Sequence, residues 1–218
     1  MSTIGELWGT LIGLKVTHAQ RWCSAWADLL FADMALMYRS ELDHAVPANL
    51  FHRRALWESA VVSYGRCAVS DQKRKIPFKE FVEEVTGDDG VALHERIMDW
   101  RHGHVAHRKR AEFESIETVL AFATGSAHPN ALRLVLGIES GPKNDDEFVV
   151  AFQSHIKTLR DAMCEKRLAP LGVEIVDDLN ADCIERPTQL RPADDQSSHE
   201  RYVITHTLAD LGAGGPRV

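Results

Sequence analysis

Cysteine and long apolar runs are both scarce in this sequence. The four cysteines, Cys23, Cys67, Cys164 and Cys183, stand singly, without the paired spacing of a zinc site or the density of a disulfide scaffold, and this predicts a reducing compartment. No run of about eighteen apolar residues is present that could cross a membrane, and no basic segment precedes the modest apolar stretch near the N-terminus. We therefore expect a cytoplasmic protein that has no membrane partner.

An excess of positive charge is missing as well. The formal net charge is -7, which argues against a protein that coats nucleic acid over its whole surface. Positive charge concentrates in two places, residues 73–75 and residues 96–110. Any contact with a nucleic acid is therefore expected to be local, and the first cluster by itself is typical of a solvated loop.

Helical periodicity is the main positive signal. Hydrophobic residues make up 44% of the chain and charged residues 26%, which are ordinary values for a globular domain with a substantial core. Apolar residues recur at helical spacing in residues 15–42. Pro47 suits the first turn of a second helix, whose apolar stripe runs from Leu50 to Ala68. Two long helices joined by a short connection are expected to pack antiparallel.

Two shorter helices are predicted next. The first lies between Pro77 and Gly87, because proline favours a helix start and glycine a helix end. The second follows an aspartate cap and has Leu93, Ile97 and Trp100 on its buried face. The same face extends to His104, which we therefore expect to pack in the core.

The pattern changes to that of strands after residue 115. Segments 116–122 and 132–138 are strand-like and flank a turn-rich stretch, which predicts a small β-hairpin at about 115–139 laid on the bundle. A capped helix should follow from about residue 144 and stop at Pro170 and Gly172. Residues 1–170 are thus predicted to form one mainly α domain, an antiparallel helical bundle with a β-hairpin. Residues 171–218 are predicted to form an acidic, irregular and partly disordered tail.

One stretch differs from this scaffold. Residues 99–110, DWRHGHVAHRKR, bring an arginine, three histidines and a basic run into about one helical span. A guanidinium can hold a phosphate, and an imidazole with a pKa of about 6.5 can move a proton near neutral pH. Arg101 and His107 are therefore the residues best suited to cleavage of RNA.

This stretch resembles the signature of the HEPN family (higher eukaryotes and prokaryotes nucleotide-binding). In that signature a polar residue follows an arginine, and a histidine comes a few positions later. Arg101, His102 and His107 occupy those places, with His102 where the family most often has asparagine. Ala106 and Arg108 flank His107 as in many prokaryotic members.

The resemblance implies a HEPN-like bundle over roughly residues 15–167 and a metal-independent endoribonuclease of toxin–antitoxin or phage-defence type. His107 would act as general base or acid, Arg101 would steady the charge on phosphorus, and His102 would orient its neighbours. Attack by the RNA's own 2′-hydroxyl would leave a 2′,3′-cyclic phosphate and a 5′-hydroxyl. The implied partners are RNA, a second copy of the chain and an antitoxin protein, with no cofactor. The expected substrate contacts are Arg108, Lys109, Arg110, Arg66 and Tyr64.

The spacing of Arg101 and His107 raises a geometric problem. Six residues on a regular helix correspond to a net rotation of about 240°, so the two side chains would not share a face. Gly103 allows a local break. The other solution is a site built across two copies, and the resemblance implies the same, because catalytic HEPN proteins usually form two-fold dimers whose motifs face one cleft.

Three other readings compete with this one. A metal site at His102, His104 and His107 is disfavoured, because residues two apart on a helix point about 200° apart. Covalent catalysis through Cys67 or Ser70 lacks a base that the sequence can assign. A non-catalytic module that uses the same fold to bind nucleotide, RNA or a protein is favoured by the histidine at position 102 and by the acidic net charge.

Overall fold

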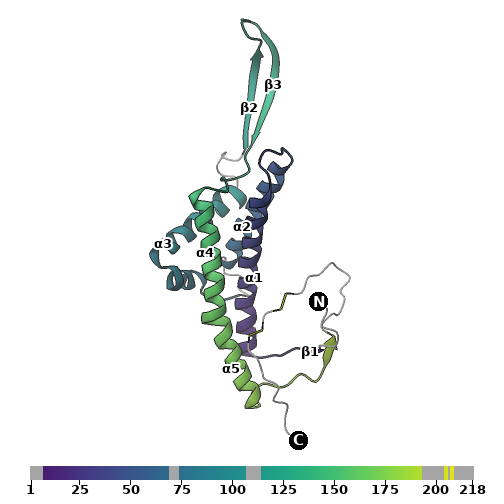
Figure 1. The fold of residues 1–218 in the computed structure, drawn as a ribbon, viewed down its shortest axis with the longest axis vertical. Helices are drawn as coiled ribbons and strands as arrows, with labels where there is room; N and C mark the ends of the chain where they lie inside the picture. The colour runs from purple at the N-terminus through teal and green to yellow at the C-terminus, as the bar shows by residue number, and fades with distance from the viewer. Residues whose placement is uncertain (1–6, 69–73, 107–113, 193–203, 206, 209–218) are drawn as a thin grey trace. The chain divides into compact units, whose positions relative to one another are not determined.

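The computed structural model describes residues 7–68, 74–106, 114–192, 204–205 and 207–208. These residues are mainly helical, with a small antiparallel β part (Figure 1). The helices are α1 (Leu14–Glu41), α2 (Asn49–Ala68), α3 (Phe78–Trp100), α4 (Glu147–Met163) and α5 (Ala169–Asn180), with π-helical turns at Arg101–Ala106 and Cys164–Leu168. The strands are β1 (Leu7–Gly9), β2 (Glu114–Phe122), β3 (Pro129–Ile138) and β4 (Leu190–Pro192). The mainly helical fold class with a hairpin is therefore confirmed.

The chain divides into two compact units. Residues 25–160 form the larger unit, and residues 1–24 together with 161–218 form the smaller one. Both units have their own buried side chains, for example Trp57 in the larger unit and Trp22 in the smaller one.

The long helices follow the apolar periodicity. In α1 the side chains of Ala25, Leu29, Ala32 and Leu36 are all buried, and their spacing of three or four residues keeps them on one face. Helix α2 begins at Asn49, two residues after Pro47. Both helices start within a few residues of the predicted positions.

The two predicted helices between residues 77 and 100 are joined across a kink. Gly87 has a φ angle of 62° within α3, a left-handed backbone conformation that residues with a Cβ atom rarely adopt. The glycine therefore ends one helical segment and lets the next begin at once. This second segment continues to Trp100, and its buried face includes Ile97.

Aromatic side chains hold the core of the larger unit together. The ring of Trp57 lies edge-on to Trp100 at 5.2 Å and to Phe148 and Phe152 at 6.0 Å each. Tyr64 lies edge-on to Phe152 at 5.4 Å. Edge-to-face pairs at these centroid distances are favourable beyond the area that they bury. They join α2, the end of α3 and the start of α4.

The hairpin is present but is not covered as predicted. Strands β2 and β3 pair antiparallel in a register that sets Thr118 opposite Leu134, with an irregularity at Ala121/Phe122. Ile116 is 73% exposed and Leu134 is 79% exposed. The prediction that the hairpin is laid on the bundle is therefore wrong, because large apolar side chains on both strands stay exposed.

Helix α4 does not end the ordered part of the chain. A π-helical turn at Cys164–Leu168 leads into α5, and Pro170 lies in the first turn of that helix. The backbone stays helical through this turn, in which the N–H of Ala169 donates to the carbonyl oxygen of Cys164, so the helix does not end before the proline. The predicted helix end at Pro170 and Gly172 is wrong for this reason.

The smaller unit extends into the predicted tail. Lys15 contacts Asp178 at 3.0 Å and Glu174 at 3.7 Å, and β1 pairs antiparallel with β4. The rest of the predicted tail lies mostly outside the described residues. Among the helices that the structure describes, none combines the length and the apolar character that crossing a bilayer requires.

Candidate nucleic-acid interface

Arg101 lies where α3 passes into a π-helical turn. The preceding residue, Trp100, is fixed by its edge contact with Trp57. The backbone from Arg101 to Ala106 is π-helical, a rare conformation that is frequent at functional sites. The expected separation of Arg101 and His107 held only for a helix that runs straight through, and the π-helical backbone departs from such a helix. The rotation between Arg101 and His107 therefore does not follow from regular helical geometry.

The stem of Arg101 rests against Gly65 of α2. A Cβ atom added at Gly65 would lie 2.0 Å from Cδ and 2.5 Å from Nε of Arg101. Any larger residue at position 65 would therefore displace the guanidinium. Gly65 is buried and Arg101 is half-buried, so the glycine supplies the space that this arginine occupies.

The guanidinium of Arg101 pairs with no carboxylate among the residues that the structure describes. His102 is exposed, and Gly103 follows it in the same turn. A half-buried guanidinium without a counter-charge favours binding of an anion, since its planar donors match two oxygens of a phosphate or carboxylate.

Several predicted site residues lie outside the described residues. These are His107, Arg108, Lys109 and Arg110. The side chain of His104 also falls outside the described part, so its predicted place in the core stays a prediction. The Arg101 and His107 pair likewise stays a prediction.

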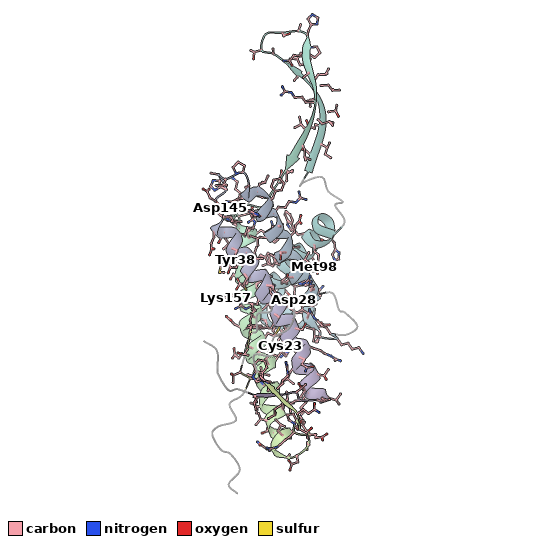
Figure 2. The ribbon with its side chains drawn as sticks, turned by 90° about the vertical axis from the view of Figure 1, so that its right-hand side faces the viewer. Cys23, Asp28, Tyr38, Met98, Asp145 and Lys157 are labelled. Atoms are coloured by element: carbon pink, nitrogen blue, oxygen red, sulfur yellow. The ribbon has the colours of Figure 1, made fainter. Side chains whose placement is uncertain are left out.

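Arg66 and Tyr64 flank Gly65 on α2 but have different surroundings. Arg66 is exposed and lies 3.8 Å from a carboxylate oxygen of Asp28, which also pairs with Arg74 at 2.5 Å. Figure 2 labels Asp28 on α1. Arg66 can therefore contact a ligand by giving up its long ion pair with Asp28. Tyr64, in contrast, is fully buried.

The hydroxyl of Tyr64 lies between two buried histidines. It is 2.8 Å from Nδ1 of His94 and 3.0 Å from Nε2 of His155. Two neutral rings satisfy this geometry when one accepts the hydroxyl proton and the other donates to the hydroxyl oxygen. Burial lowers the pKa of His155 to about 4, and the neighbouring His94 adds to this effect. In this position Tyr64 serves the core, and no exposed part of it is free to contact a substrate.

Cys67 is also unsuited to covalent chemistry. It is buried, and its thiol lies 3.4 Å from the carbonyl oxygen of Ala25. Burial raises the pKa of this thiol far above its ordinary value, so the nucleophilic thiolate is strongly disfavoured. Ser70 lies outside the described residues, and in the described part of the chain no group of three or more potential ligands converges on a metal position.

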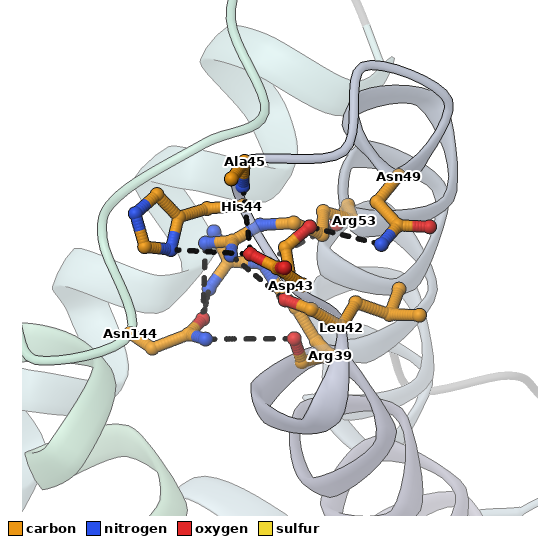
Figure 3. Close-up of polar contacts among 8 residues, drawn as sticks. All are labelled: Arg39, Leu42, Asp43, His44, Ala45, Asn49, Arg53 and Asn144. Atoms are coloured by element: carbon orange, nitrogen blue, oxygen red, sulfur yellow. Dashed lines mark hydrogen bonds and ion pairs between the residues drawn. The ribbon is translucent and has the colours of Figure 1, made fainter.

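A second polar cluster, Arg39, Arg53 and Asn144, did not follow from sequence reasoning (Figure 3). Arg39 is fully buried and Arg53 is 8% exposed. A signal was present, because Arg39 follows Leu36 by three residues and Arg53 precedes Trp57 by four, so both arginines occupy the buried stripes of their helices. An arginine on a buried stripe indicates a polar site inside a helical unit.

Comparison with known proteins identifies no relative of this chain. Neither a protein-family model nor a curated protein nor a solved structure matches this chain.

Proposed function

We propose that the surface around Arg101 binds RNA and that the protein is a HEPN-like, metal-independent endoribonuclease. The observation that carries this proposal is the setting of Arg101. Its stem is seated on Gly65, its guanidinium pairs with no carboxylate among the described residues, and an exposed imidazole follows it in a π-helical turn. This combination suits a phosphodiester better than it suits a purely structural role.

The proposed chemistry divides between two residues. Arg101 holds the non-bridging oxygens of the phosphodiester and stabilises the charge that develops on them during cleavage. His107 accepts the proton of the 2′-hydroxyl or donates one to the leaving 5′-oxygen. His102 orients the phosphate or its neighbours, and Arg66, Arg108, Lys109 and Arg110 hold adjacent phosphates. Neither a metal ion nor a cofactor takes part.

We further propose that two copies of the chain face one another across this surface. Two basic segments placed together repel each other, so bound RNA should tighten the dimer, and should do so less at high salt. Light scattering with and without a short RNA measures this. If the protein stays monomeric at about 10–100 μM with and without RNA, the two-copy site is excluded and any site must lie within a single chain.

The experiment that tests the proposed function is cleavage of single-stranded RNA in the presence of a chelator. We expect purified protein to produce fragments that end in 2′,3′-cyclic phosphates and begin with 5′-hydroxyls. Cleavage that requires an added divalent metal would contradict the proposal. Binding of RNA without any cleavage would instead favour the non-catalytic module, which the net charge of -7 also supports.

A further inference from the structure

Arg39 anchors the segment that leads into α4. Its Nε donates to the carbonyl oxygen of Arg53 at 3.3 Å. Its Nη1 donates to Oδ1 of Asn144 at 2.5 Å, and its Nη2 donates to the carbonyl oxygens of Ser140, at 3.2 Å, and of Pro142. All of these acceptors are neutral. Arg39 therefore has a structural role that is complete without any ligand.

Arg53 is held much less well. Its Nη1 lies 3.2 Å from the carbonyl oxygen of Leu42, and its Nη2 lies 3.4 Å from Oδ1 of Asn144 (Figure 3). Both bonds are at or beyond the long end of the usual range, and the Asn144 oxygen is already occupied by Arg39. A guanidinium has five N–H donors, so Arg53 retains donors that these two contacts do not satisfy.

The two arginines also lack a counter-charge. No carboxylate in the part of the chain that the structure describes pairs with Arg39 or Arg53. Burial lowers the pKa of Arg39 to about 10, and the charge of Arg53 contributes to that change. Two buried cations side by side are unfavourable unless an anion comes close to them.

A cavity adjoins Arg53 and is open to an anion. Its volume is about 710 Å³, and its polar lining includes Arg53, Lys143, Asn144 and Asp145. One wall is apolar and is formed by Val46, Pro47 and Leu50. A volume of this size with an apolar wall and a few polar groups is typical of a small-molecule site. The two cations of this lining, Arg53 and Lys143, outnumber its acidic residue, Asp145, which is exposed.

We propose that this cavity binds a small molecule in which an oxyanion, a phosphate or a carboxylate, is attached to a compact apolar body. Arg53 and Lys143 hold the oxyanion, and Val46, Pro47 and Leu50 cover the apolar body. The site is separate from the proposed RNA surface, because Arg53 and Gly65 are twelve residues apart on α2, or about 18 Å along the helix. The proposal therefore does not depend on RNA cleavage.

Calorimetric titration of the whole protein with phenyl phosphate, benzoate and inorganic phosphate tests this inference. We expect saturable binding of phenyl phosphate or of benzoate at one site per chain, and the stronger of the two identifies the oxyanion. Inorganic phosphate lacks an apolar body and should bind more weakly than phenyl phosphate. No saturable binding of any of the three probes up to about 10 mM would overturn the proposal.

Matched charge-removing variants locate the binding. Arg53→Gln and Lys143→Gln should each weaken binding of the better probe by about tenfold or more, because each removes a charge-assisted contact. Lys157→Gln removes another exposed charge, from α4 about three turns beyond Asp145 (Figure 2), and should leave binding unchanged. Lys143 is exposed, so its variant stays informative even if Arg53→Gln fails to fold. If Lys143→Gln binds the probe as tightly as the unaltered protein, the assignment of binding to this cavity is overturned.

Discussion

Replacing Gly65 with alanine is expected to reduce RNA cleavage by about 100-fold, because a misplacement of about 1 Å in a positioning group can cost that much. The added Cβ atom would fall 2.0 Å from Cδ of Arg101, so the guanidinium has to leave its position. Alanine is more favourable than glycine within a helix by about 1 kcal/mol. Overpacking at this buried contact opposes that gain, so the variant should lose activity with little net change in stability.

Single-turnover cleavage rates and urea unfolding of the same preparations measure this. Arg101→Ala should lose at least as much activity as Gly65→Ala, because it removes the guanidinium altogether. Ser59→Ala changes an exposed position on the same helix and should cleave at the unaltered rate. Full activity in Gly65→Ala together with an inactive Arg101→Ala would show that the contact with Gly65 does not position the arginine.

Mild acid is expected to destabilise the folded protein through the buried histidines. The pKa of His155 is lowered to about 4 by burial and by His94, and the pKa of His94 is also lowered, chiefly by burial. In the unfolded chain a histidine titrates at a pKa of about 6.5. Between these values the unfolded chain binds more protons than the folded one. Stability is therefore fully present above pH 6.5 and falls as the pH is lowered toward 4.

The expected loss from His155 is about 2 kcal/mol between pH 6.5 and pH 5, since each pH unit in this window contributes about 1.4 kcal/mol. Urea unfolding at both pH values measures it, and the window avoids most titration of carboxylates. His155→Gln should flatten the dependence on pH, whereas His52→Gln, at an exposed position, should not. If His155→Gln keeps the same pH dependence, His155 is not the source of the loss of stability in mild acid.

Tyr64→Phe provides a second control on the same cluster. It leaves both histidines in place but removes the oxygen between them, so buried ring nitrogens lose their partner. We expect a loss of about 1–3 kcal/mol at pH 7. A loss much smaller than this would mean that the hydroxyl is not needed to hold the two rings.

The sequence predicts the larger elements well because they depend on repeated spacing. The stripes that contain Leu29 and Leu36 in α1, and Trp57 and Tyr64 in α2, recur often enough to identify helices and their buried faces. Gly87 marks the break within α3 for a steric reason that is visible in the residue itself. The paired strands β2 and β3 likewise follow from residue type and turn signals.

Two kinds of feature could not be predicted from the sequence. These are local changes in helical or strand geometry, and contacts between residues far apart in the chain. The π-helical turns at Arg101–Ala106 and Cys164–Leu168 have no signature in the sequence, and the second one carries the helical backbone on to Pro170. Strands β1 and β4 have three residues each, too few to show a period. The Arg39, Arg53 and Asn144 cluster joins segments that are far apart in sequence, so spacing alone could not assemble it.

Cleavage of one RNA and its 2′-deoxy counterpart in a chelator tests the central claim most directly. The proposed reaction at Arg101 and His107 uses the 2′-hydroxyl of the substrate as nucleophile, so the molecule without it has no route to cleavage. We predict that the RNA is cut to 2′,3′-cyclic ends and that the oligonucleotide of the same sequence without 2′-hydroxyls stays intact under identical conditions. Cleavage of both molecules, or of neither, would contradict the account.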